Sequence, residues 1–506
     1  MRGDPSVAVD AAGAATPDAP LAFRAVRGGM WVALSSWWTI VAGFAANIVL
    51  TRLLAPEAFG VFALAMFFAQ ALRVQPRLGL GYAFGQHPRT DGETLGTFLT
   101  MDLSAAAAGL ALIVAAMPVL LALGYGALTV QVAALLGLAA TVESVTSTGT
   151  TLLEKELRFG HVSVIQAVVF PLSYAPALWL AARGEGVWSL VAQNVTYNVL
   201  YLVGVAALLA RGWGRLRGVG WSFSRDLARR FLRFGAGVGL GLLGVTLLMQ
   251  LDNLLVGSLV GVAVLGYYDR AYRTAQWPGT LLNALIARTG FYTYARLQND
   301  AERLGRALRM MVWLIAALAL PVALAVFVAA PDLLVLLYGE RWLPSVPYLR
   351  VLALVAGARP LVDNANTLFA AVGKPWLAAR LTGAQVAVLA AAGLPLVWRW
   401  GALGACLAVA LATGAGLFLV LRRLDDAVPG TARELVAPAL AAVVALAGGL
   451  AIGGLPFVSA LGVGLRVAVK AGGAATLFAV AIVAVQPRQA RERVAYVMRL
   501  ARAERE

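Results

Sequence analysis

The feature that most constrains the fold is a series of long apolar segments separated by short polar connections. Each is about 20 residues long, the length a helix needs to cross the hydrocarbon core of a bilayer. Because lipid offers the backbone no hydrogen-bond partners, such segments must be helical. We therefore predict an all-α polytopic membrane protein with about 14 transmembrane helices. The predicted spans are 28–51, 58–80, 98–122, 127–151, 161–182, 187–210, 234–257, 262–286, 309–331, 346–372, 376–398, 401–421, 435–455 and 459–485.

Composition excludes several other classes of protein. The chain is 60% hydrophobic and only 13% charged, so a soluble fold would expose far too much apolar surface. The net charge of +16 suggests nucleic acid at first, but the basic residues lie mostly in short connections between spans, which membrane topology explains. We predict no nucleic-acid partner. One cysteine, Cys406, and two histidines, His87 and His161, form no cluster, so we expect neither a metal site nor a cofactor.

The distribution of Lys and Arg predicts the orientation of the chain in the membrane. Most of the 41 basic residues fall in alternate connections, which the positive-inside rule places in the cytoplasm together with both termini. An odd number of spans would scramble this bias. The few that fall on the outer side are Arg52, Arg183, Arg341, Arg350 and Arg399.

An internal repeat divides the chain. Asn47–Gly60, NIVLTRLLAPEAFG, aligns without gaps on Asn253–Gly266, NLLVGSLVGVAVLG, at an offset of 206 residues. Parallel repeats of this kind are common in transporters that alternate between inward-open and outward-open states. The predicted division is a disordered cytoplasmic tail (1–23), an N-lobe of helices 1–6 (24–210), a basic cytoplasmic linker (211–233), a C-lobe of helices 7–12 (234–425), two extra helices (426–486) and a basic cytoplasmic tail (487–506).

The stretch Gln250–Arg273 places polar residues inside two consecutive predicted spans. Asp252 and Asn253 lie in the first, and Asp269, Arg270 and Arg273 lie in the second. A charge at the centre of a span costs about 2.5–3.5 kcal/mol, so these residues are expected to face a bundle interior or a watery cavity. Two interpretations stay open: a local ion pair between Asp269 and Arg273, four residues apart, or a net cationic translocation cavity.

Five further basic positions lie within or at the ends of predicted spans. Arg359 precedes Pro360, which should bend its helix, and lies four residues before Asp363, so it either pairs locally or contacts substrate. Arg24 and Arg52, at the cytoplasmic and outer ends of the first span, are either substrate contacts or interfacial anchors. Arg466 and Lys470, also four residues apart, have no nearby acid in the sequence, and we expect them to extend to the interface.

Buried acids suggest cation coupling. An antiporter needs a carboxylate that exchanges H⁺ or Na⁺, and Asp252, with Asn253 beside it, is the first candidate. Asp269 and Asp363 are further candidates. The alternative interpretation is an acid that is paired at a contact between helices.

Several motifs carry a family resemblance. The segments GGMWVALSSWWTIVAGFAANIVLTRLLAPEAFGVFALA, EKELRF and LDNLLVGSLVGVAVLGYYDRAYRTAQWP resemble the polysaccharide transporter family of the multidrug/oligosaccharidyl-lipid/polysaccharide exporter superfamily. The resemblance covers residues 24–425. It implies two six-helix lobes around a central cavity, in the bacterial inner membrane, that move a polyprenyl-diphosphate-linked oligosaccharide to the outer leaflet by alternating access. A polysaccharide polymerase and export machinery are the protein partners that such a role implies.

Arginine suits this substrate because its planar guanidinium donates paired hydrogen bonds to phosphate. The candidate substrate-binding residues are Arg24, Arg52, Arg270, Arg273 and Arg359. No phosphate-cradling GxxxxGK[ST] loop occurs, so we expect a transporter and not an enzyme. The alternatives are a multidrug/cation antiporter of the same superfamily, a lipid II flippase, and a non-transporting scaffold of a polysaccharide assembly complex.

Overall fold

The computed structural model describes residues 19–73, 79–88, 91–155, 158–212, 222–487 and 492–493. Side chains are described for these residues except 19–33, 211–212, 240–241 and 281–289. Within the described part all regular secondary structure is helical and no strand occurs, as predicted. The helices are α1 (Ala19–Leu53), α2 (Pro56–Ala71), α3 (Leu80–Gln86), α4 (Gly92–Ala122), α5 (Ala127–Lys155), α6 (Phe159–Ala182), α7 (Val187–Gly212), α8 (Arg225–Leu259), α9 (Val262–Leu297), α10 (Ala301–Tyr338), η3 (Glu340–Ser345), α11 (Val346–Ala371), α12 (Pro375–Ala427), η4 (Ala432–Leu435), α13 (Val436–Gly453), α14 (Pro456–Ser459) and α15 (Val463–Val485).

Among the described residues, 11 helices are long and apolar enough to cross a membrane. This is fewer than the expected number of about 14, for three physical reasons. First, α12 joins two predicted spans across a break at Trp400 and Gly401, where Gly401 adopts a φ of 58°. Second, α9 carries the Asp269–Arg273 charges and Gln276, which lower its hydropathy. Third, α2 has only 16 residues.

The predicted boundaries outside the spans differ from the helix limits. Residues 1–18 of the predicted tail lie outside the described part, and α1 already begins at Ala19. Of the predicted linker, 213–221 lie outside the described part, whereas the basic residues from Arg225 onward form the first turns of α8. The predicted C-terminal tail is described only at 487 and 492–493.

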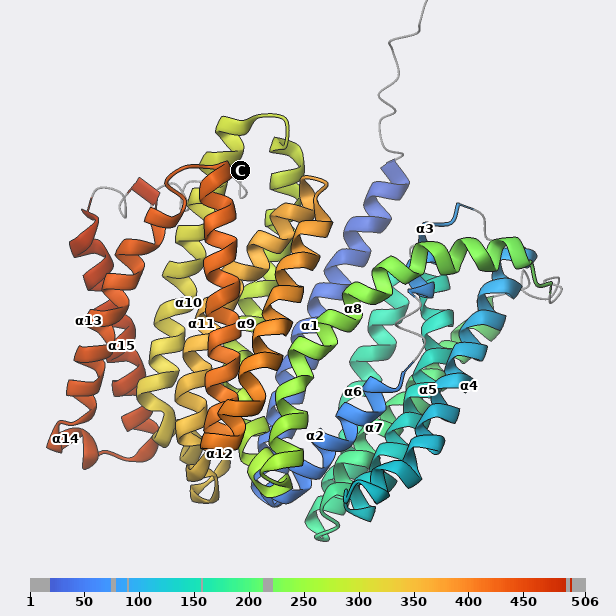
Figure 1. Ribbon diagram of the computed structural model, residues 1–506, viewed down its shortest axis with the longest axis horizontal. Helices are drawn as coiled ribbons and strands as arrows, with labels where there is room; N and C mark the ends of the chain where they lie inside the picture. Colours follow the sequence, from blue (N-terminus) through green and yellow to red (C-terminus); the bar gives the residue numbers. More distant parts are fainter. Residues whose placement is uncertain are drawn as a thin grey trace, which may run out of the picture.

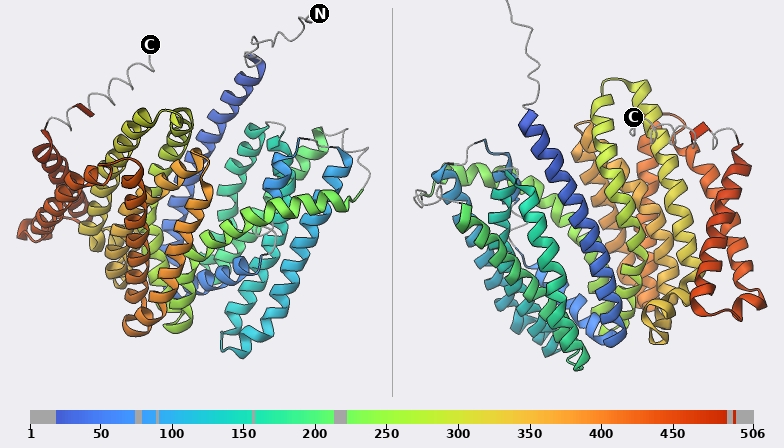
Figure 2. Two further views of the ribbon diagram at one scale, coloured as in Figure 1. Left: turned by 45° about the horizontal axis from the view of Figure 1, so that its top comes forward. Right: turned by 180° about the vertical axis from the view of Figure 1, so that it is seen from behind.

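The helices form two groups (Figure 1). In the N-terminal half, α1 packs on α6, α6 on α7, and α5 on α2, α4 and α7. In the C-terminal half, α11 packs against α9, α10 and α12. The long helix α8 passes between the halves, with contacts to α3 and α4 at its start and to α2 and α12 further on. The α13–α15 hairpin packs on the outer side of α10, away from the N-terminal half (Figure 2).

The two halves meet where the repeat predicted equivalent positions. A Cβ added to Gly60 of α2 would overlap the carbonyl oxygen of Val262 in α9, and a Cβ added to Gly266 would overlap the carbonyl oxygen of Pro56. Gly60 and Gly266 are equivalent in the repeat, as are Pro56 and Val262. The contact is therefore reciprocal, as expected for two units related by a pseudo-twofold axis.

The largest core cluster lies around this crossing. It combines residues of α1, α2 and α5 with residues of α9, α11 and α12, and Trp342 of η3 and Tyr268 of α9 are fully buried in it. We call the side of the bundle that carries η3 and the α1–α2 connection the η3 end. The start of α1 and the end of α15 lie on the opposite side (Figure 1).

Candidate functional site

A cavity of about 430 Å³ lies beside the crossing of the two halves. Four helices line it: α1 from the N-terminal half, α8 between the halves, and α9 and α10 from the C-terminal half. Its walls combine charged, amide, hydroxyl and aromatic groups. The lining residues are Asn47, Met249, Gln250, Asn253, Asp269, Arg270, Tyr272, Arg273, Gln276, Trp277, Thr280 and Tyr338.

The charges of the cavity come from one turn of α9. Asp269 accepts hydrogen bonds from Arg270 Nη2 at 2.6 Å and from Arg273 Nε at 3.0 Å. The cluster therefore holds one carboxylate between two guanidinium groups. The local Asp269–Arg273 pair that the sequence allowed therefore exists, and the second arginine leaves an excess of one positive charge at the cavity.

The two arginines differ in their surroundings. The side chain of Arg270 is 6% exposed, and its guanidinium lies 4.2 Å from the ring centre of Phe59 in α2 and donates to Asn47 Oδ1 of α1 at 2.6 Å. The side chain of Arg273 is 51% exposed and lines the cavity. Of the two, Arg273 is therefore the one with a surface available to a ligand.

Asp252 and Asn253 point in different directions from α8. Asp252 is 1% exposed, accepts a hydrogen bond from the Tyr268 hydroxyl at 2.5 Å and is not among the lining residues of the cavity. Asn253 lines the cavity, and its Nδ2 donates to Gln250 Oε1 at 3.0 Å. Asn253 is thus part of the cavity wall, and Asp252 is packed behind it.

Arg359 and Asp363 line a second, smaller cavity of about 80 Å³ between α8, α11 and α12. Arg359 donates to the Tyr272 hydroxyl at 3.3 Å and contacts Met249 Sδ at 3.0 Å. Because Tyr272 and Met249 also line the larger cavity, they separate Arg359 from it by a single side-chain layer. The remaining polar groups around the smaller cavity are Asn366, Thr382, Gln385 and Thr413.

Arg52, another candidate arginine, is not among the described residues that line the cavity. Arg52 donates to the carbonyl oxygens of Leu336 and Leu337, the last turn of α10, at 2.6 and 2.9 Å. It thereby ties α1 to α10 at the η3 end. Arg24 lies in the first turns of α1, and its side chain is outside the described residues.

The lining residues that sequence reasoning did not select for the site are Asn47, Met249, Gln276, Thr280 and Tyr338. One of them carried a usable signal. Asn47 is the repeat equivalent of Asn253, and both asparagines line the same cavity. The asparagine shared by both copies of the repeat therefore indicated a position in the cavity wall. Tyr338 and Thr280 carried no such signal, because helix packing alone brings them to the cavity.

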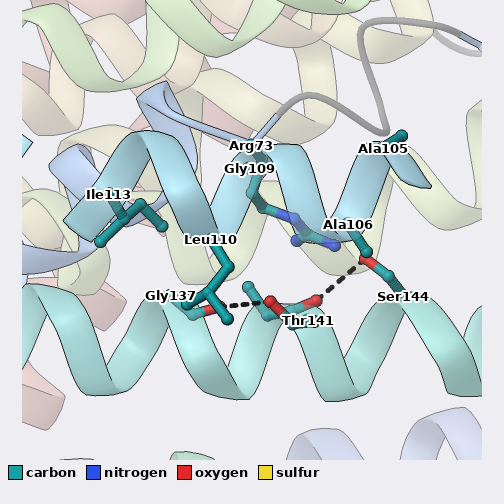
Figure 3. A pocket seen from close by; sticks show the side chains of 10 residues that line it. Arg73, Ala105, Ala106, Gly109, Leu110, Ile113, Gly137, Thr141 and Ser144 are labelled. Atoms are coloured by element: carbon teal, nitrogen blue, oxygen red, sulfur yellow. Dashed lines mark hydrogen bonds between the residues drawn. The ribbon is translucent and has the colours of Figure 1, made fainter. Parts of the chain in front are cut away.

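The N-terminal half has a charged pocket of its own, but it is too small for a ligand. Figure 3 shows the Arg73 side chain between α4 and α5. Its Nη1 lies 3.1 Å from Glu143 Oε2, and the space beside it measures about 10 Å³. Such a volume admits at most about one water molecule.

A second cation-rich cluster attaches α15 to α10. Asp332 lies 2.6 Å from Lys470 Nζ and 3.1 Å from Arg466 Nε. The sequence has no acid close to Arg466 and Lys470, whereas the structure pairs both with Asp332. The acid lies 138 residues earlier in the chain, so the local sequence contained no trace of it.

These features define a class: a helical membrane protein with two repeat-related halves and a charged cavity between them. A family model described as "Polysaccharide biosynthesis protein" matches residues 49–347, and the chain belongs to this family. The match confirms the family resemblance predicted from the motifs.

Two relatives with printed roles are the succinoglycan biosynthesis transport protein ExoT of Rhizobium meliloti and the lipopolysaccharide biosynthesis protein WzxC of Escherichia coli. ExoT is 25% identical over 65% of this chain and 65% of its own length. WzxC is 27% identical over 44% of this chain and 44% of its own length. The chain thus matches less than two thirds of the length of either relative.

The fold is shared with a solved transporter structure. The lipid II flippase MurJ in an inward closed conformation superimposes with a TM-score of 0.73 at 11% identity, covering 90% of this chain and 98% of MurJ. At this identity the likeness establishes the fold and not the substrate.

Proposed function

We propose that the chain is a flippase that moves polyprenyl-diphosphate-linked oligosaccharide repeat units across the bacterial inner membrane for surface or exopolysaccharide biosynthesis. The observation that carries the proposal is the cavity of about 430 Å³ between the halves, with an excess of positive charge on α9. Membership of a polysaccharide biosynthesis family supports the same substrate class.

The cavity wall fits the two parts of such a headgroup. The half-exposed Arg273 offers charge-assisted hydrogen bonds to the diphosphate. The amides of Gln250, Asn253 and Gln276 and the hydroxyl of Thr280 offer donors and acceptors to sugar hydroxyls. Trp277 offers an apolar face to a sugar ring. The prenyl chain stays in the surrounding lipid, because it is apolar and needs no polar group of the protein to solvate it.

The depth of Arg273 suits a carrier that holds its substrate midway. Arg273 lies 11 residues after the start of α9 at Val262, which corresponds to about 16 Å along a helix. This is about half of a 30 Å hydrocarbon core. The η3 end faces the outside in this proposal, because the connections with most Lys and Arg lie on the opposite side. Rocking of the two halves about the α2–α9 crossing then exposes the site to each side in turn.

Coupling to H⁺ or Na⁺ is assigned to Asp363. It lines the smaller cavity with Asn366, Thr382, Gln385 and Thr413, which supply amide and hydroxyl oxygens. Asp252 is disfavoured because it is packed against Tyr268 behind the cavity wall. In vesicles, Asp363→Asn should remove the dependence of transport on an imposed H⁺ or Na⁺ gradient. Unchanged dependence on both gradients would rule out Asp363.

The central test compares two arginines in the same assay. Purified protein in vesicles is given a polyprenyl-diphosphate-linked oligosaccharide, and its arrival in the opposite leaflet is measured. Arg273→Ala should slow transport by roughly 10- to 100-fold, since charged hydrogen bonds contribute about 1.5–3 kcal/mol. The matched control is Arg306→Ala, which removes an equivalent i,i+4 pair with Glu302 at an exposed position away from the cavity.

Three outcomes would redirect the proposal. Equal transport by wild type and Arg273→Ala would remove the site assignment, and no transport by the purified wild type would favour a scaffold role. Transport of cationic drugs in place of the glycolipid would indicate a multidrug antiporter, although a cationic cavity opposes such substrates. Transport confined to lipid II, together with an essential gene, would indicate a cell-wall flippase.

A further inference from the structure

Arg270 is enclosed by groups from the opposite half of the molecule. Its Nη1 donates to Asn47 Oδ1 of α1, and its guanidinium lies over the ring of Phe59 of α2. Its Nε and Nη2 both donate to Asp269 on its own helix. With its side chain only 6% exposed, little of this guanidinium is left for a ligand.

We infer that Arg270 is not a ligand of the transported headgroup but a latch between the two halves, with Asn47 as its positioning partner. The inference rests on the proposed function only for its effect on transport; the latch itself is a property of the free protein. It separates the roles of two arginines that are three residues apart on α9: Arg273 binds, and Arg270 holds the halves together.

The surroundings of Arg270 suit this role. It lies one helical turn from Gly266, where α9 touches the backbone of α2. Other contacts join the halves on both sides of it: towards the η3 end, Trp342 Nε1 donates to the Thr51 carbonyl at 3.0 Å and the Tyr125 and Ser258 hydroxyls lie 2.8 Å apart. On the side away from the η3 end, the ring centres of Phe44 in α1 and Trp277 in α9 lie 3.4 Å apart. Among these contacts the Asn47–Arg270 bond is the one of which both residues line the cavity.

This position gives substrate a way to release the latch. Asp269 is shared between Arg270 and Arg273. An anion that binds Arg273 competes with Asp269 for that guanidinium, so the carboxylate is left to Arg270 alone. Asp269 then draws Arg270 away from Asn47, and the halves lose the contact that joins them at the cavity. Binding of the anion can shift the protein from the latched to the released conformation only if the released conformation binds the anion more tightly.

The test measures conformation without substrate. Spin labels are placed at Leu123→Cys and Trp398→Cys, exposed positions at the ends of α4 and beside the break in α12, with Cys406→Ser to remove the native thiol. Asn47→Ala should shift the distance distribution to longer values, because it removes the acceptor of Arg270. Asn47→Asp should hold the short distance and lower kcat for transport by about tenfold, since a charged acceptor binds arginine more tightly.

The matched control is Asn253→Ala. Asn253 is the repeat equivalent of Asn47 and lines the same cavity, but it bonds to Gln250 on its own helix. Its loss should leave the distances as in wild type and act on KM. For Asn47→Ala we expect the reverse, a changed kcat with KM altered by less than about twofold.

Distances unchanged in Asn47→Ala would overturn the latch, as would an Arg270→Lys variant that raises KM as much as Arg273→Ala does while keeping wild-type distances. Should Asn47→Ala fail to fold, Asn47→Asp still decides the matter, because a wild-type kcat in that variant contradicts the latch. Altered distances in a protein that moves no glycolipid would instead retain the latch and reject the proposed function.

Discussion

Two clusters in this protein have the same charges but different surroundings. On α9, Asp269 lies between Arg270 and Arg273; at the contact of α10 and α15, Asp332 lies between Arg466 and Lys470. Each cluster has one carboxylate and two cations. In the first cluster all three groups lie on one turn of α9, and in the second the carboxylate lies on α10 and both cations lie on α15. The shortest distance in each is 2.6 Å.

The difference lies in the space beside the charges. Arg273 is half exposed and borders a cavity of about 430 Å³, whereas Lys470 and Arg466 are 14% and 28% exposed, and neither cavity described above is lined by the second cluster. Excess positive charge inside a membrane protein therefore does not by itself mark a binding site. A site also needs a void that the neighbouring helices do not fill.

The largest expected effect is that of Asp269→Asn. This change leaves two guanidinium groups without their anion, one of them almost fully buried, and removal of one partner from a buried pair costs about 3–5 kcal/mol. The exposure of Arg273 puts our expectation near the lower figure. We expect a clearly lowered unfolding temperature and a loss of transport. A variant with wild-type stability would show that Asp269 is not needed to hold Arg270 and Arg273.

A smaller effect is expected for Asp332→Asn. Lys470 and Arg466 are partly accessible, so water and lipid headgroups can compensate for the lost anion, and we expect a cost of about 1–2 kcal/mol. Because the cluster holds the α13–α15 hairpin and not the cavity, transport should stay within about threefold of wild type. Thermal unfolding and the vesicle assay check both parts. A loss of transport equal to that of Asp269→Asn would erase the distinction between the clusters.

The smallest effect is expected for Arg466→Gln. Asp332 keeps Lys470 at 2.6 Å, and a partly exposed ion pair contributes about 0–1 kcal/mol. Unfolding temperature and transport should both stay close to wild type. The informative comparison is with Arg273→Ala, which removes the corresponding second cation from the other cluster. If Arg466→Gln impaired transport as strongly, the α10–α15 contact would also belong to the substrate path.

Much of the fold could be predicted from the sequence. Each predicted span except two overlaps a separate helix; the two from 376 to 421 merge into α12. The repeat aligned Gly60 with Gly266 as equivalent positions, and the structure places these two glycines at a reciprocal contact that the alignment did not predict. The predicted number of about 14 spans is not confirmed, because 11 helices among the described residues are long and apolar enough to cross a membrane.

The site was predicted less completely, because side-chain direction is not a local property. The sequence singled out the α9 charges as a group, and Arg273, Arg270, Asp269 and Asn253 line one cavity. The sequence did not separate Arg270 from Arg273, whose different exposures depend on Phe59 and Asn47. Nor did it place Asp252 behind the cavity wall, where its partner is Tyr268.

The sequence by itself determined an all-helical membrane protein with a repeat and a polar segment at 250–273, because the cost of placing charge in hydrocarbon acts on each span separately. The tertiary structure alone decided which charges are satisfied by other helices. Asn47 and Arg270 are 223 residues apart, and Asp332 and Lys470 are 138 apart. Such pairs arise only when packing brings helices together, and packing also decides where a cavity is left open beside them.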